Sequence, residues 1–175
     1  LGFFRVNPAG RVTVHPDGNS KQGLDLYQLA MDLNAQGVGL PMLLRFSDIL
    51  RVRIEALGDA FRRAIDESAY QATYTNVYPI KVNQQRQVVE EVLEFGRPYH
   101  FGLEAGSKPE LLAVVALADN DTPIICNGFK DDGFIDVACL AVQAGKKVIV
   151  VVEKLNELRM LLKHHAETGV APLIG

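Results

Sequence analysis

The sequence predicts a parallel α/β protein that forms part of a (β/α)8 barrel. First, short apolar runs alternate with longer amphipathic stretches from Leu40 onward, and a new run begins roughly every 25 residues, the length of one strand-loop-helix-loop unit. Second, the runs are continuous, as in parallel strands that are buried on both faces. Third, no G-x-G-x-x-G follows the first run, so the sequence favours a barrel over an open, doubly wound sheet.

The opening residues predict a small β segment followed by a helix. Asn7-Pro8-Ala9-Gly10 has the composition of a turn, and Arg11-Val12-Thr13-Val14 alternates polar and apolar residues as a strand does. Apolar residues then recur at helical spacing from about Leu24 to Ala35, and Gly37 is a plausible stop. We assign residues 1–39 to this N-terminal segment.

We expect the second part, residues 40–175, to be an incomplete barrel. The expected strands are the apolar runs 41–46, 74–82, 100–103, 123–126, 147–152 and 171–174. The expected helices are 47–68, 86–95, 108–117, 131–144 and 154–167, with Ser107 to Glu110 as a capping box and Gly169 as a left-handed helix end. Because a complete barrel has eight strands and about six βα units are visible, we expect this chain to be the first part of a longer protein.

The composition indicates a globular protein and argues against nucleic acid and membranes as partners. The chain has 175 residues, of which 48% are hydrophobic and 22% charged, with a net charge of -3. A nucleic-acid binder would carry a basic face, and no apolar run is long enough to cross a bilayer, so we expect neither partner. Cys126 and Cys139 lie in apolar runs without metal-ligand spacing, so we expect reduced core cysteines and a cytoplasmic location. The pair His164-His165 lies at an expected helix end, where we predict a solvated terminus and no metal site.

One lysine interrupts the apolar strand expected over residues 74–82. If Tyr78, Ile80 and Val82 face the helices, strand alternation turns Lys81 toward the barrel interior. Lys81 also lies near the carboxyl-terminal end of the strand, where barrel enzymes carry their chemistry. A lysine there can form a Schiff base with an aldehyde cofactor, because a partly buried site favours the neutral amine. The position leaves a second interpretation equally open, a lysine that reaches solvent and pairs with a carboxylate.

Several motifs resemble a known family of enzymes. The segment Tyr78-Pro79-Ile80-Lys81-Val82-Asn83-Gln84 resembles the cofactor-lysine strand of the biosynthetic arginine decarboxylases. These belong to the fold-type-III, alanine-racemase-like group of pyridoxal-phosphate enzymes, together with ornithine and diaminopimelate decarboxylases. Residues 102–108 (GLEAGSK), 126–131 (CNGFKD) and 151–154 (VVEK) resemble the following rim segments of the same enzymes. The similarity runs from about Tyr74 to Gly175 and is looser upstream.

The resemblance implies a function and roles for three residues. Lys81 would bind pyridoxal 5'-phosphate covalently, and the enzyme would convert L-arginine to agmatine and CO2 for polyamine biosynthesis. Glu104 stands where related decarboxylases carry an acidic residue near the cofactor, although it could equally be a rim carboxylate that pairs with Lys81 or an arginine. Asn83 could orient the lysine loop and so contribute to cofactor binding, but asparagine after a strand also serves ordinary turns. Magnesium is implied by the family alone.

The resemblance also implies parts that this stretch does not contain. We expect the glycine-rich phosphate-binding loops, the acidic partner of the ring nitrogen and a C-terminal β-domain to lie beyond Gly175. The family builds its sites across a homodimer interface and often forms tetramers, so we expect the same of the full-length protein. Residues 1–175 alone should be inactive. The alternatives are a decarboxylase-like binding or regulatory protein without turnover, and a pyridoxal-phosphate carrier of the same fold.

Overall fold

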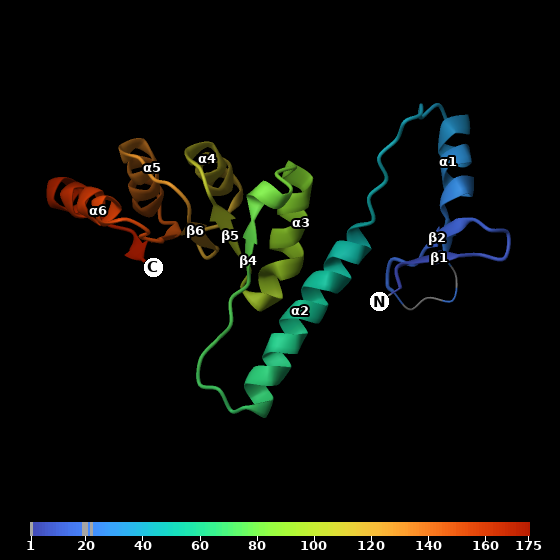
Figure 1. Ribbon diagram of the computed structural model, residues 1–175, viewed down its shortest axis with the longest axis horizontal. Coiled ribbons are helices and arrows are strands. Elements are labelled where there is room, and N and C mark those ends of the chain that lie inside the picture. The colour runs from blue at the N-terminus through green and yellow to red at the C-terminus, as the bar shows by residue number, and fades with distance from the viewer. Residues whose placement is uncertain (1, 19–20, 22) are drawn as a thin grey trace. The chain divides into compact units, whose positions relative to one another are not determined.

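The computed structural model describes residues 2–18, 21 and 23–175, which fall into two compact units (Figure 1). The first unit is Leu1–Leu57 and the second is Gly58–Gly175. Helix α2 (Ser47–Glu67) begins in the first unit and ends in the second. No helix among the described residues combines the length and the apolar character needed to cross a membrane. The division into domains at residues 39 and 40 stays a prediction.

The first unit holds an antiparallel three-stranded sheet and one helix. The strands are β1 (Phe4–Val6), β2 (Val12–Val14) and β3 (Leu24–Asp25), in that order across the sheet. Helix α1 (Leu26–Ala35) follows directly, because the Asp25 carboxylate accepts a hydrogen bond from the Gln28 backbone N–H at 3.0 Å and caps the helix. The two predicted strands and the helix are confirmed, whereas β3 was not predicted because two residues carry no periodic signal.

The second unit is a parallel sheet with a helix after each of its first four strands. The strands are β4 (Val77–Pro79), β5 (Gly102–Ala105), β6 (Pro123–Cys126), β7 (Lys147–Val150) and β8 (Leu173–Ile174). The helices are α3 (Arg86–Gly96), α4 (Lys108–Leu117), α5 (Asp132–Gln143) and α6 (Leu155–Thr168), with short 3-10 helices η1 (Ile80–Val82) and η2 (Arg97–Tyr99). All neighbouring strands are parallel and follow the order of the chain. Helices α3 to α6 stand in the same order (Figure 1).

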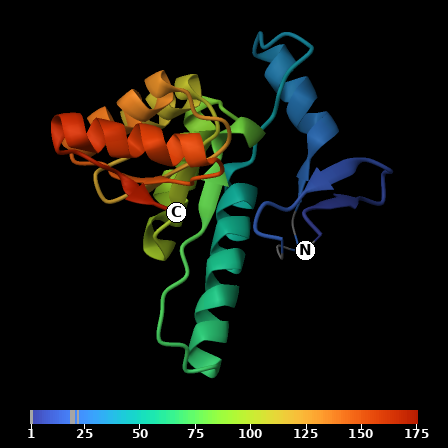
Figure 2. The same ribbon diagram turned by 60° about the vertical axis from the view of Figure 1, so that its left-hand side comes forward.

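One apolar core lies between the sheet and the helices. Alternate residues of the strands, such as Leu103, Ile124 and Val148, are buried against Leu111 of α4 and Phe134 of α5. Figure 2 shows α4, α5 and α6 gathered on one side of the unit. A doubly wound sheet would reverse its strand order and place helices on both faces. The sequential order with one helical layer therefore confirms the predicted partial (β/α) barrel.

Five of the six expected strands differ in their bounds from the structure. Two are only shorter, since the strand expected over 147–152 ends at Val150 and the one expected over 171–174 begins at Leu173. The other three differ more. Residues 41–46 form no strand, because no neighbouring strand hydrogen-bonds to them in the described structure, and Leu43 is 75% exposed. The strand expected over residues 74–82 is shortened to Val77–Pro79, since the chain turns into η1 at Ile80. His100 cannot lie in a strand, because its φ of 56° is left-handed, and β5 begins at Gly102 instead.

Candidate functional site

The candidate site is the carboxyl-terminal edge of the parallel sheet, which we call the rim. It comprises the residues that follow β4, β5, β6 and β7, namely 80–83, 106–107, 127–130 and 151–154. The ladder of hydrogen bonds continues into it: the Asn127 N–H donates to the Ala105 carbonyl at 3.0 Å, and the Val151 N–H donates to the Cys126 carbonyl at 2.9 Å. The hydrogen bonds between the strands therefore continue into the first residue of the loops after β6 and β7.

Lys81 lies on the rim, two residues after the end of β4. The structure places it in η1, where its side chain is exposed. No hydrogen bond or ion pair involves its amine within residues 2–18, 21 and 23–175. The alternative interpretation of Lys81, a pairing with a carboxylate, is thus not seen among these residues. The turn of the chain at Ile80 also overturns one detail of the predicted alternation, because Val82 does not face the helices and is 70% exposed.

Tyr78 and Asn83 hold the turn that carries Lys81. The Tyr78 hydroxyl donates to the Asn83 carbonyl at 3.3 Å, and the Gln85 backbone N–H donates to the Asn83 side-chain oxygen at 3.1 Å. Burial raises the pKa of Tyr78 above its ordinary value, so the phenol remains a hydrogen-bond donor at neutral pH. The Asn83 side chain forms the local turn before α3, which fits a role in orienting the lysine loop. A direct contact of Asn83 with a cofactor stays a prediction.

Glu104 lies on the face of the sheet opposite the helical core. Its neighbours Leu103 and Ala105 are both fully buried in that core, so alternation turns Glu104 to the other face. In the register of the sheet, Glu104 is paired with Pro79 of β4 and with Ile125 of β6. No hydrogen bond or ion pair of Glu104 is found in the described part of the chain. Its carboxylate is half-buried, has no partner among the described residues, and lies beside β4, the strand that leads to Lys81.

The turn after β5 is built by a helix cap. The Glu110 backbone N–H donates to Ser107 Oγ at 3.4 Å, and Ser107 Oγ donates to Glu110 Oε1 at 3.1 Å. Glu110 Oε2 also accepts from the Gly106 N–H at 2.8 Å. The predicted capping of α4 by Ser107 is confirmed, and Glu110 reaches one residue further back than the usual capping box. Asp131 caps α5 in the same way, accepting from the Phe134 N–H at 2.7 Å.

Two charged residues, Lys130 of the rim and Glu157 of α6, were not among the predicted site residues. Lys130 and Glu157 form a buried ion pair, with Lys130 Nζ 3.5 Å from Glu157 Oε2 and side-chain exposures of 0% and 1%. Burial alone would raise the pKa of Glu157, but the backbone N–H of Glu153, the charge of Lys130 and the Lys154 N–H outweigh it and hold this pKa below its ordinary value. Lys130 lies within the 126–131 motif, but no sequence signal joins this loop residue to a glutamate on α6.

The remaining candidates of the sequence are two histidines and two cysteines. His164 Nε2 lies 3.9 Å from Asp136, and the His165 carbonyl accepts from Gly169, whose φ of 74° confirms the predicted left-handed helix end. No group of three or more histidine, cysteine, aspartate or glutamate side chains is arranged for a metal ion within the described residues. Cys126 and Cys139 are free and buried, as predicted.

A cavity of about 230 Å³ lies at the opposite, amino-terminal edge of β4 and β5. Aromatic side chains line much of it, including Phe61, Tyr74, Tyr99 and Phe101. Phe61 and Tyr74 stack with their ring centroids 3.6 Å apart. This edge of the unit lacks the lysine and carboxylate of the rim, so the chemistry is assigned to the rim and not to this cavity.

The comparisons with known proteins agree with the fold. The family described as "Pyridoxal-dependent decarboxylase, pyridoxal binding domain" matches residues 53–174. The chain belongs to this family. Its parallel sheet and helical layer are thus those of a pyridoxal-binding domain.

Similar proteins carry a more specific name. The chain is 50% identical to "Biosynthetic arginine decarboxylase" of Gloeobacter violaceus over 99% of this chain and 27% of that protein. It is 48% identical to the protein of the same name from Rhodopirellula baltica, over 99% of this chain and 26% of that protein. The chain therefore spans about a quarter of the length of these curated relatives.

Two solved structures are similar in fold. The crystal structure of the biosynthetic arginine decarboxylase from Campylobacter jejuni matches with a TM-score of 0.88 and 33% identity, over 99% of this chain and 29% of that one. The diaminopimelate decarboxylase from M. jannaschi matches with a TM-score of 0.71 and 18% identity, over 99% and 35% of the two chains. At that identity the second likeness shows the fold alone.

Proposed function

We propose that the full-length protein is a pyridoxal-phosphate-dependent carboxy-lyase that converts L-arginine to agmatine and CO2 in polyamine biosynthesis. The observation that carries the proposal is Lys81, an exposed amine at the carboxyl-terminal edge of a pyridoxal-binding domain, with no ion pair to a described residue. The names of the relatives that are 48% and 50% identical support arginine as the substrate.

The residues of the rim fit the aldehyde end of the cofactor. A neutral Lys81 Nζ would form a C=N bond with the aldehyde carbon and release one water molecule. Glu104 would supply the acidic group near the ring, and Gly106, two residues later, has no side chain to obstruct a flat ring. Asn83 would keep the loop of Lys81 in place through its turn.

When bound, pyridoxal phosphate supplies the electron sink for the electron pair that the departing carboxylate leaves behind. In the overall reaction the bond between the α-carbon of arginine and its carboxylate breaks, CO2 leaves, and the α-carbon takes up one proton. Lys81 would also be the group that holds and returns protons on this side of the site. The Lys81 amine has no hydrogen bond or ion pair with a described residue, so it is available for proton transfer.

The proposal extends to the assembly and its surroundings. We infer a homodimer or tetramer for the full-length protein and a cytoplasmic location, which two free, buried cysteines suit. Magnesium is part of the proposal only through the family resemblance, and no residue of this stretch is assigned to it.

The experiment that tests the proposal is an assay of the full-length protein with arginine, ornithine and lysine. We expect agmatine and CO2 from arginine, together with a visible absorbance band of bound cofactor. Lys81→Ala should lose both, whereas Lys163→Ala, an exposed lysine of α6, should retain both. Turnover that survives Lys81→Ala, or a preference for ornithine or lysine, would contradict the proposal.

A further inference from the structure

The buried ion pair of Lys130 and Glu157 requires an explanation beyond stability. Removing two charges from water costs as much as their attraction returns, and such pairs can often be replaced by neutral side chains without loss of stability. The Oε1 atom of Glu157 is also buried and has no hydrogen-bond partner in the described structure, which adds to the cost. Stability therefore does not account for the pair.

Both partners bind the main chain of rim loops. Lys130 Nζ donates to the Gly128 carbonyl at 2.5 Å, in the loop after β6. Glu157 Oε2 accepts from the Glu153 N–H at 2.9 Å and from the Lys154 N–H at 3.3 Å, in the loop after β7. Each charge thus fixes one loop, and the ion pair joins the two.

A further hydrogen bond closes these contacts into a ring. The Gly128 N–H donates to Glu153 Oε1 at 2.9 Å. The path from Gly128 to Glu153, to Glu157, to Lys130 and back to Gly128 is therefore continuous, and we call it the rim ring. Lys154 also lies 4.8 Å above the ring of Phe129, a second bridge between the same loops.

The rim ring also reaches the loop after β5. Gly128 has a φ of 79°, and a Cβ at that position would lie 3.0 Å from the Gly106 carbonyl oxygen. Gly106 follows Glu104 by two residues, so a shift of Gly128 would push on the loop that continues from Glu104. Through Gly128 the ring thus sets the shape of the rim from β5 to β7.

We propose that Lys130 and Glu157 are positioning residues that, through Gly128 and Glu153, hold the rim in the shape that receives the cofactor. The inference rests on the proposed pyridoxal-phosphate function of the same site. Neither residue is proposed to touch the cofactor or the substrate. They act on the main chain, whose misplacement by about 1 Å can reduce the rate of an enzyme about 100-fold.

The test uses the full-length protein and the double variant Lys130→Met/Glu157→Gln. This variant removes both charges and keeps each side-chain length to within one atom, so it should fold with a thermal midpoint near that of the parent. We expect kcat/KM to fall about 100-fold, chiefly through kcat, and the absorbance spectrum of the bound cofactor to change. Without cofactor, hydrogen exchange in peptides spanning residues 126–131 and 151–157 should rise about two- to tenfold, as for the loss of one hydrogen bond.

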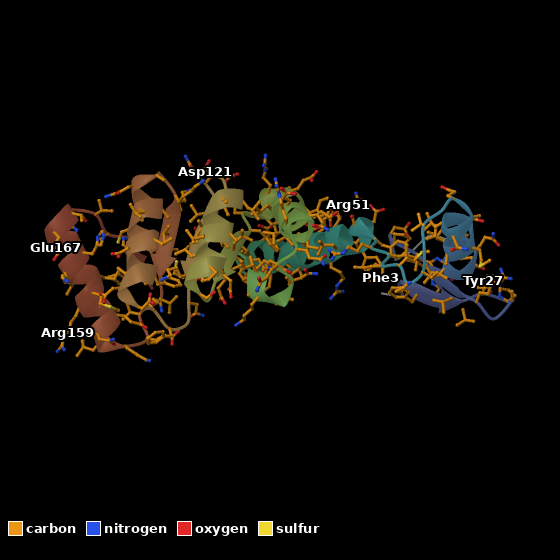
Figure 3. All side chains as sticks on the ribbon, turned by 90° about the horizontal axis from the view of Figure 1, so that it is seen from above. Phe3, Tyr27, Arg51, Asp121, Arg159 and Glu167 are labelled. Atoms are coloured by element: carbon orange, nitrogen blue, oxygen red, sulfur yellow. The ribbon has the colours of Figure 1, made fainter. Side chains whose placement is uncertain are left out.

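The matched control is the exposed pair Lys147 and Asp121, 3.4 Å apart at the opposite edge of the same sheet. Asp121 is labelled in Figure 3, in the turn that follows α4. The double variant Lys147→Met/Asp121→Asn should keep the kcat/KM, the cofactor spectrum and the exchange rates of the parent. A second variant, Gly128→Ala, displaces the loop and leaves the side chains of Lys130 and Glu157 unchanged. It should reproduce the activity and spectral changes of Lys130→Met/Glu157→Gln.

Parental kcat/KM, spectrum and exchange in a folded Lys130→Met/Glu157→Gln would overturn the inference. If that variant does not fold, parental activity in Gly128→Ala would overturn it as well. Failure of the proposed function has a different signature: the unmodified full-length protein would then lack a cofactor spectrum or produce no agmatine. The hydrogen-exchange arm does not need cofactor or substrate, so it reports on the rim ring in either case.

Discussion

Pro79 of β4 and Glu104 of β5 are direct partners in the parallel sheet, and they set the level at which the site begins. Glu104 is turned away from the helical core because Leu103 and Ala105 on either side of it are buried there. Pro79 is followed two residues later by Lys81. The register of two short strands thus brings to one edge of the sheet the Glu104 carboxylate and the Lys81 amine, neither of which is paired with a described residue.

Replacing Glu104 tests its role in cofactor binding. In the full-length protein, Glu104→Gln keeps the shape of the side chain and removes its charge, and we expect kcat/KM to fall by at least about tenfold because an acidic group near the ring is lost. The folding stability should not fall, since Glu104 makes no ion pair with a described residue. Glu94→Gln, an exposed position on α3, is the control for steady-state kinetics and thermal melting. Parental kinetics in Glu104→Gln would show that Glu104 is only a surface carboxylate of the rim.

Leu103 is the test of the core beneath the site. It is fully buried at the centre of the apolar core, so Leu103→Ala should lower the free energy of unfolding by about 2 to 5 kcal/mol. Leu112→Ala on α4, where the leucine is 56% exposed, should change it by less than about 0.5 kcal/mol. Urea denaturation of both full-length variants measures the difference. Equal effects would mean that the assigned core face of β5 is wrong.

The cap of α4 predicts a smaller effect. Ser107→Ala removes the oxygen that accepts from the Glu110 N–H, and we expect a loss of about 1 kcal/mol in the free energy of unfolding. Ser68→Ala, an exposed position after α2, should have almost no effect on the same urea curve. A Ser107→Ala variant as stable as the parent would contradict the assigned cap.

The buried thiol of Cys126 should lower the free energy of unfolding at alkaline pH. Burial raises the pKa of this thiol from 9.0 to about 12, despite the opposing charge of Lys130. Above pH 9 the unfolded chain loses the thiol proton while the folded chain keeps it, so the free energy of unfolding should fall as pH rises from 9.0 toward about 12. The slope from this group is at most about 1.4 kcal/mol per pH unit. Cys126→Val should reduce the slope measured by urea denaturation, and an unchanged slope would show that the thiol ionises equally in both states.

Most of the second unit could be predicted from the sequence because its signals are local. Helix α4 and strand β6 have the predicted bounds, since a cap, a turn and an uninterrupted apolar run mark their ends. The strand expected over residues 41–46 is not formed, because a strand needs a hydrogen-bonded neighbour and an apolar run alone does not supply one. Strand β4 ends early, at Pro79, because the chain turns into a 3-10 helix there. The sequence does not indicate this turn, since Ile80 and Val82 are apolar like the strand residues before them.

The site likewise has one feature that a local sequence pattern predicts and another that depends on residues far apart in the sequence. The strand pattern placed Lys81 at the end of β4, and the resemblance supplied its proposed role. The pairing of Lys130 with Glu157 could not be predicted, because it joins residues 27 positions apart through a fold that brings two loops together.

The most direct test of the central claim is to trap the cofactor on its lysine. Borohydride reduces the C=N bond between pyridoxal phosphate and an amine to a stable C–N bond, so the modified peptide of the full-length protein can be identified by mass spectrometry. We predict that the pyridoxyl group is found on the peptide that contains Lys81. A pyridoxyl group on another lysine, or on none, would contradict the account.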